Sequence, residues 1–232
     1  MVHCGLIPGL GETSINAQLQ QTKSWSWKQN PEAVKADILA VAREEFAEHG
    51  LSGARIKKIV ERTKSSKRMV FYYLGDEEGL YRAVMEEAYE SVRRQEKELD
   101  LNGLPPDRAL LRLVEFTFDH HRANPEFIRL VAIENIHRGR HMADMSDLAD
   151  LNSAAIETLE RICAAGVAEG VFRPDVSPLV LHWQISAVCY FNVANRHTFG
   201  QNFGGGQFSE TAQAEQRPSI ARSVLEGARS RA

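Results

Sequence analysis

Apolar residues recur at intervals of three and four positions along most of the 232-residue chain. This spacing places them on one face of an α-helix, whereas a half-buried strand needs alternation at every second residue, which no stretch sustains. Breaks rich in glycine, proline and asparagine separate the helical stretches. We therefore predict an all-α fold without a sheet. The predicted helices occupy residues 31–49, 54–62, 66–74, 76–99, 107–122, 125–138, 145–169, 177–199 and 217–229.

The pattern also divides the chain into parts. Residues 1–30 are rich in Gly, Ser, Thr, Gln and Asn and show no helical period, so we predict a flexible amino-terminal arm. Residues 31–80 hold three helices, enough for a small bundle. Residues 81–232 hold the remaining helices and are predicted to form a second, larger helical domain.

Two short helices follow each other closely between residues 52 and 80. Ile56 and Ile59 give the first an apolar face. A polar interruption comes next, in which Ser65 or Ser66 can accept a hydrogen bond from the free N–H groups of a new helix. The second helix has few apolar positions dedicated to packing. This arrangement predicts a helix-turn-helix, with the preceding helix as the third wall of its core.

Charge and side-chain type give this stretch a function. Between residues 52 and 75 seven basic side chains stand against one acid, although the whole chain has a formal net charge of -3. A local excess of basic residues is the electrostatic footprint of a DNA-reading module. Basic, hydroxyl and aromatic side chains can reach phosphates and base edges. The candidate DNA-binding residues are Arg55, Lys57, Ser65, Ser66, Lys67, Arg68, Met69, Phe71, Tyr72 and Tyr73.

Residues 32–80 resemble the amino-terminal domain of the TetR family of transcriptional regulators. The resemblance rests on AVKADILAVAREEFAEHGL and on SKRMVFYYLGDEEGLY, which usually reads SKGTLYYHFGSKEGLY in that family. It implies a helix-turn-helix that binds a palindromic operator as a homodimer, and a helical domain that binds a small effector. Phe71 and Glu77 depart from the family, which usually has tyrosine and lysine there, both on DNA phosphates. Lys64 stands where the family often has glycine.

Two late segments are candidates for dimerisation. The helix predicted at 177–199 has too many apolar residues for one buried face, which indicates that a second side is also covered. The last helix, at 217–229, can join it in a four-helix seam across a two-fold axis. We therefore predict that the protein forms a homodimer. Together with the helix-turn-helix, this gives two predicted partners, a second copy of this chain and double-stranded DNA.

Histidine, asparagine and aromatic residues mix with aliphatic ones between residues 116 and 142. Such a mixture suits a pocket for a small organic molecule, although each residue taken singly is better explained as a helix cap or a solvated side chain. Residues of the late apolar helix can line the opposite wall. The candidate effector-binding residues are Phe116, His120, Phe127, Asn135, His137, His141, Trp183 and Tyr190.

A metal site is the alternative interpretation of this segment. Glu134, His137 and His141 share one helical face, but Gly139 is expected to interrupt the helix and no cysteine cluster accompanies them. We predict no metal and no cofactor. The chain has no phosphate-binding loop, no Gly-x-Ser-x-Gly elbow and no His-Glu-x-x-His pair, so no catalytic residue is assigned and no enzyme is predicted.

Further limits come from length and composition. No run of about eighteen apolar residues exists and the first residues lack the pattern of a secretory signal, so we expect a cytoplasmic protein with no membrane partner. Three widely spaced cysteines argue against a disulfide framework. We predict a ligand-responsive DNA-binding regulator, with repression as the expected action. The alternatives are an activator, or a small-molecule-binding helical protein with altered DNA binding.

Overall fold

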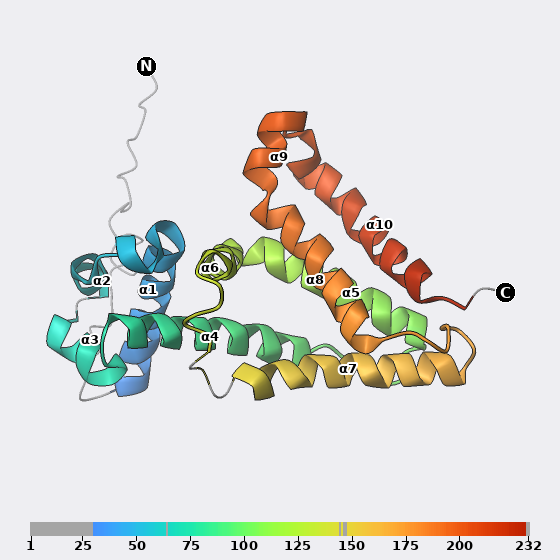
Figure 1. Cartoon of the computed structure of the whole chain (residues 1–232), viewed down its shortest axis with the longest axis horizontal. Coiled ribbons are helices and arrows are strands. Elements are labelled where there is room, and N and C mark those ends of the chain that lie inside the picture. Colours follow the sequence, from blue (N-terminus) through green and yellow to red (C-terminus); the bar gives the residue numbers. More distant parts are fainter. Residues whose placement is uncertain (1–29, 64, 144, 146–147, 231–232) are drawn as a thin grey trace, which may run out of the picture.

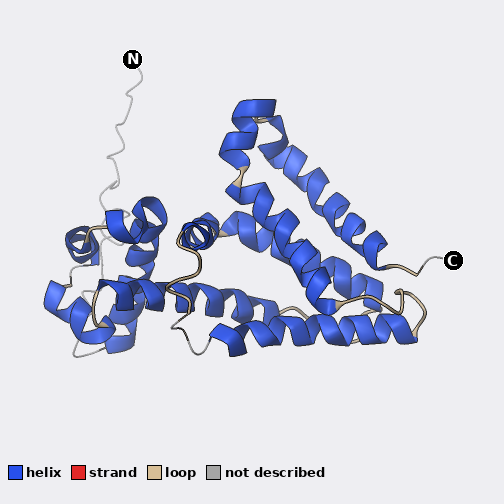
Figure 2. Ribbon diagram, in the orientation of Figure 1, coloured by secondary structure: helices blue, strands red, loops and turns tan. Residues whose placement is uncertain are grey.

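The computed structural model describes residues 30–63, 65–143, 145 and 148–230, without the side chains of residues 148–152. The predicted arm and Lys64 lie outside these residues. In the described part ten α-helices and one short 3-10 helix form, and no strand does, which confirms the all-α prediction (Figure 2). The α-helices are α1 (Pro31–Gly53), α2 (Ile56–Thr63), α3 (Lys67–Leu74), α4 (Glu77–Lys97), α5 (Pro106–Ala123), α6 (Pro125–Ile136), α7 (Leu148–Ala168), α8 (Pro178–Ala194), α9 (Arg196–Phe203) and α10 (Glu210–Ala228).

Helix ends in the first half follow local chemistry. Asn30 caps α1 by accepting a hydrogen bond from the Ala33 N–H at 3.0 Å, and Gly50 interrupts the same helix with φ +67. Asp76 caps α4 at 2.7 Å from the Gly79 N–H. Side-chain oxygens at these positions satisfy backbone donors that the first helical turn leaves free. The predicted helix starts and the break at Gly50 are therefore confirmed.

The first three helices pack around one apolar core. Ile38 and Phe46 of α1 meet Ile59 of α2 and Val70 of α3, and all four are fully buried. The start of α4 closes this core, where the Tyr81 ring meets the Phe46 ring edge to face at 5.2 Å. Two eight-residue helices alone bury little apolar surface, so α1 and α4 are needed to hold α2 and α3 in place.

Helix α4 runs from this three-helix unit into the rest of the molecule (Figure 1). Its buried stripe begins with Leu80 and Val84 in the first core. One and two turns further on, Ala88 and Val92 lie in a second cluster with Phe127 of α6. A single helix therefore belongs to both halves of the structure.

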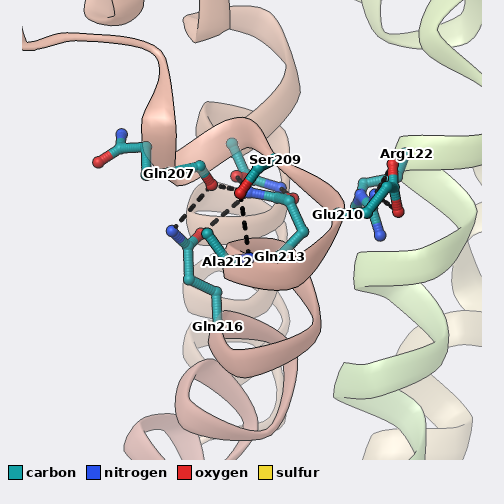
Figure 3. Close-up of polar contacts among 8 residues, drawn as sticks. Arg122, Gln207, Ser209, Glu210, Ala212, Gln213 and Gln216 are labelled. Carbon is teal, nitrogen blue, oxygen red and sulfur yellow. Dashed lines mark hydrogen bonds and ion pairs between the residues drawn. The ribbon is translucent and has the colours of Figure 1, made fainter.

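The last part of the chain differs from the prediction in two places. Helix α10 begins at Glu210 and not at 217, because Ser209 caps it and Pro218 is accommodated inside it. The buried Gln213 side chain ties its first turns down, donating to the Gln207 carbonyl at 2.9 Å and pairing with Asn192 (Figure 3). The helix predicted at 177–199 is two helices, α8 and α9, which meet at Asn195. The backbone N–H of Asn195 closes α8 on the Phe191 carbonyl, and its side chain makes no cap hydrogen bond to α9.

A second core joins α5, α7, α8 and α10. Phe118, Leu159, Ile185 and Leu225 come from these four helices in turn, and each is buried. In Figure 1 α8 slopes across α5 and α10 descends on its far side, while α7 runs along the base beside the far half of α4. The four helices form the frame behind the second half of α4.

A buried polar cluster fixes α6 against the first core. The carboxylate of Glu134 accepts hydrogen bonds from the His141 N–H at 2.8 Å and from the Tyr81 hydroxyl at 3.3 Å, and lies 2.9 Å from His141 Nδ1. Burial raises the pKa of the Glu134 carboxyl, but these hydrogen bonds outweigh burial and lower its pKa below the ordinary value. The cluster therefore holds an ionised carboxylate between α4 and α6.

Replacing Glu134 tests this cluster. Because its folded pKa is lowered, the ionised carboxylate stabilises the fold above its unfolded pKa of about 4.5, and the stabilisation is lost as pH falls through the lower folded value. We expect Glu134→Gln to reduce the free energy of unfolding by about 2 kcal/mol at pH 7 and by less at pH 4. Urea unfolding at both pH values measures the difference. The exposed Glu90→Gln is the control, and an equal loss at both pH values would contradict this account.

A second prediction concerns Gly166 in α7. A Cβ atom built on Gly166 would lie 2.2 Å from the ring of Phe172, which is buried in the second core. We expect Gly166→Ala to cost about 1–3 kcal/mol, because the ring has to shift within a packed core. Gly227 of α10 has nothing within 4 Å of its Cβ position, so Gly227→Ala should not destabilise. Chemical denaturation compares the two, and equal stabilities would refute the clash.

Candidate functional site

Helix α3 presents a basic and hydroxyl-bearing face. Ser66 caps it, accepting a hydrogen bond from the Met69 N–H at 3.2 Å. Lys67, Arg68 and Tyr72 are exposed, and the Tyr72 side chain is 81% accessible. Val70 and Leu74 fix the opposite face in the first core. The helix is therefore held from behind while its polar face is free to meet another molecule.

The other predicted residues of α3 divide by position. Phe71 and Tyr73 are half-buried and pack against the first core. Met69 and Ser65 are also half-buried. The Lys67 ammonium lies over the Phe71 ring, 5.4 Å from its centre. The two aromatic rings thus support the helix as well as bordering its exposed face, which the sequence pattern did not separate.

Basic residues near α2 extend the same surface. Arg55 and Lys57 are both exposed, and Lys57 is 3.7 Å from Glu61 on its own helix. The Arg55 N–H donates to the buried Glu45 carboxylate at 3.1 Å, which ties the start of α2 to α1. An exposed pair such as Lys57 with Glu61 is weak in water, so it leaves the lysine available to a phosphate.

The second candidate site is a cavity of about 430 Å³ beside the second half of α4. Helices α5, α6 and α8 supply the other main walls. Volumes of this order suit small-molecule sites. Six of the eight predicted effector residues line it: Phe116, His120, Phe127, Asn135, Trp183 and Tyr190.

His137 and His141 do not line this cavity, so the structure does not bring them together with the other six predicted residues. His137 is exposed at the end of α6, while His141 is buried on Glu134 and Tyr81. The helix ends at Ile136, and Arg138 and Gly139 both take positive φ. The chain therefore turns back at this point and carries His141 toward the first core. Within the described residues no cluster of three or more His, Cys, Asp or Glu side chains has the arrangement of a metal site.

Several lining residues were missed from the sequence. Arg93 and Glu96 of α4 form a nearly buried ion pair, with 12% and 11% of their side chains exposed. Tyr89 precedes them on the same helix, and α8 adds His182. The signal was present, since Tyr89, Arg93 and Glu96 continue at helical spacing beside the apolar stripe of α4. The sequence prediction instead placed the polar groups of the pocket in the histidine-rich segment at 116–142.

The imidazoles of this cavity are neutral at pH 7. Burial lowers the pKa of His120 and His182, and the nearby Arg93 charge lowers both further. Burial and the neighbouring His120 bring the pKa of His121 down to about 4. The cavity therefore contains one fixed cation, one carboxylate paired with it and three uncharged imidazoles.

Three nitrogen atoms of the lining residues are buried without a hydrogen-bond partner among the described residues. They are Arg93 Nε, His120 Nδ1 and His121 Nδ1. An unpartnered buried polar group costs about 1–3 kcal/mol, so groups of this kind are usually satisfied by water or a ligand. All three residues line the same cavity.

Helix α8 also has an uncovered apolar face. Val180, Trp183, Val188 and Phe191 are 40–69% exposed, on the side away from its buried residues. A patch of large apolar side chains on one helix is typical of an interaction surface. No helix in the described ranges is long and apolar enough to cross a membrane.

Two family models match this chain, one over each half. Residues 38–84 match the family described as bacterial regulatory proteins, tetR family, and residues 106–224 match a tetracyclin repressor-like C-terminal domain. The HTH-type transcriptional repressor NicS of Pseudomonas putida is 33% identical over 91% of this chain and 100% of its own length. The HTH-type transcriptional repressor AcnR of Corynebacterium glutamicum is 28% identical over 68% of this chain and 79% of its own.

Solved structures share the fold. A TetR family transcription regulator from Marinobacter aquaeolei superposes with a TM-score of 0.69 at 19% identity, covering 88% of this chain and 100% of that one. A tetR-family regulatory protein from Rhodococcus gives a TM-score of 0.65 at 20% identity over 86% and 98%. The resemblance noted in the sequence is confirmed. The chain belongs to the TetR family of transcriptional regulators and carries its DNA-binding domain.

Proposed function

We propose that this protein is a homodimeric repressor that releases its operator when a small molecule occupies the cavity beside α4. The observation that carries the proposal is that α4 takes part both in the first core and in the wall of the cavity. This helix closes the core behind α3 and also supplies Tyr89, Arg93 and Glu96 to the cavity. The action as a repressor is taken from the relatives named as repressors.

The DNA-binding step uses the exposed face of α3. Lys67, Arg68 and Tyr72 would lie in a major groove, and Arg55 and Lys57 would meet the phosphates at its border. Two copies related by a two-fold axis read two half-sites of a palindrome. Phe71, lacking a hydroxyl, would contribute its ring beneath Lys67 rather than a hydrogen bond to a phosphate.

The coupling step runs through α4 and α6 together. Phe127 and Asn135 of α6 face the cavity, while Leu130 of the same helix is buried in the first core and Glu134 accepts the Tyr81 hydroxyl. A ligand that changes how α6 meets α4 would therefore change the position of the unit that carries α3. Release requires that the ligand binds the DNA-free arrangement more tightly than the DNA-bound one.

Dimer formation is assigned to α8 and α10. The apolar face of α8 that includes Val180, Trp183 and Phe191 would be covered by the same face of a second copy. Helix α10 lies beside α8 and can extend the seam. We assign no catalytic role to the protein, and as a bacterial-type regulator it would act in the cytoplasm, where it meets the chromosome.

The reading face is tested by Lys67→Ala with Arg68→Ala. Removing two positive charges should weaken binding to the DNA that flanks its own gene by at least tenfold and should flatten its salt dependence by about two counterions. Fluorescence anisotropy across a salt series measures both. Arg108→Ala with Arg112→Ala removes the same charge from the exposed side of α5 and should change neither.

The result that would refute the assignment is specific. If both double variants bind the native DNA and a scrambled duplex as the unchanged protein does, α3 is not the reading helix. Sedimentation confirms that each variant keeps its assembly state, so a loss of DNA binding cannot be traced to a loss of the dimer.

The dimer surface is tested by Val180→Glu. This position lies in the first turn of α8, three residues after the Ser177 cap, where a carboxylate suits the helix itself. Two carboxylates buried across a two-fold axis repel, so we expect a monomer by sedimentation and weak operator binding. Ala164→Glu, on the exposed side of α7, should leave a dimer. A dimeric Val180→Glu protein would move the interface away from this face.

A further inference from the structure

The walls of the cavity beside α4 carry one ion pair. Arg93 and Glu96 are its lining residues with charged side chains, and the histidines that face them are neutral. The Arg93 charge lowers the pKa of all three imidazoles, so its positive field extends across the cavity although Glu96 is paired with it. Arg93 is therefore the group on these walls that an anion can bind, although Glu96 balances its charge.

Arg93 also has unused hydrogen-bonding capacity. A guanidinium has five N–H donors in a rigid fork that matches a carboxylate in two-pronged geometry. Glu96 is bound through Nη1, whereas Nε is buried and has no partner among the described residues. Arg93 therefore keeps donors that the bond to Glu96 does not use.

Aromatic rings make up much of the remaining wall. Tyr89 and Phe127 meet edge to face at 5.2 Å, and Phe116 lies 5.7 Å from the His120 ring. Trp183 and Tyr190 complete this set from α8. Flat rings at these angles accept another flat ring, in edge-to-face or offset stacking, better than they accept a branched aliphatic group.

We propose that this cavity binds a small aromatic carboxylate of one or two rings, with its carboxylate on Arg93 and its ring among the aromatic side chains. Its identification as the effector rests on the proposed function, but its binding does not.

The pH dependence of ligand binding gives a second test of the proposal. An added carboxylate leaves the Arg93–Glu96 pair with one excess negative charge, which a proton taken up from solvent can offset. Groups facing the site that can accept it are Glu96 of α4, His120 and His121 of α5 and His182 of α8; Tyr89 and Tyr190 stay protonated. Since the bound state holds more protons, affinity for a carboxylate should rise as pH falls from 8 to 6, whereas affinity for a neutral amide should not.

The experiment is calorimetric titration of the full chain with benzoate, 4-hydroxybenzoate and 2-naphthoate. The matched probes are benzamide, which lacks the charge, and cyclohexanecarboxylate, which lacks the aromatic ring. We expect at least one aromatic acid to bind with a Kd below about 1 mM, and both matched probes to bind at least tenfold more weakly than benzoate. Binding of benzamide as tight as that of benzoate, or failure of all three acids, would overturn the proposal.

Variants then test whether Arg93 binds the carboxylate. Arg93→Gln with Glu96→Gln removes the pair without leaving a lone buried charge, and should weaken the best acid at least tenfold while benzamide is unaffected. Arg161→Gln is the control, because Arg161 lines a neighbouring cavity and not this one. Unchanged acid binding in the double variant would refute Arg93 as the anchor. The comparison of acid with amide on the unchanged protein needs no variant, so a misfolded variant does not protect the proposal.

The two proposals fail separately. If an aromatic acid binds but leaves the protein on its operator, the cavity assignment stands and the effector step of the proposed function falls. If the protein binds its operator and no acid binds, the ligand class is wrong and the DNA-binding step stands.

Discussion

The buried stripe of α4 is the contact on which the rest of the structure depends. Leu80 and Val84 complete a core that two eight-residue helices cannot form by themselves, and Val92 carries the same stripe into a cluster with α6. Because protein cores are packed like solids, one half of this helix cannot shift without repacking the contacts of the other half. The position of α3 is thus tied mechanically to the shape of a cavity far along the chain.

Much of this architecture could be predicted from the sequence. Ser66 and Asp76 cap helices, and Gly50 breaks one, through contacts with residues close in sequence. The boundaries of the first helices could therefore be predicted from neighbouring residues. The start of α10 did not, because it depends on Gln213 meeting Asn192 and the Gln207 carbonyl. Contacts between residues distant in sequence have no periodic signature, so the sequence pattern did not reveal the earlier start of the helix.

The candidate sites divide along the same line. The exposure of the basic residues of α3 could be predicted from their composition, because the core does not need them. The cavity was found in part, since histidine and aromatic residues drew attention to α5, α6 and α8. Its ion pair was missed because Arg93 and Glu96 look like ordinary members of a solvated helix until α5 and α8 cover them. His141 was misplaced because the chain reverses at Arg138 and Gly139, a turn whose direction the pattern does not give.

Trp183 belongs to two surfaces at once. It lines the cavity, and it is also one of the large apolar side chains that α8 leaves exposed, at 69%. In a dimer that covers this face, the indole would form a shared wall between the small-molecule site and the neighbouring subunit. A substitution that reshapes the site for a new compound at this position would also alter the fit of the two copies, so ligand preference and subunit pairing cannot be tuned independently there.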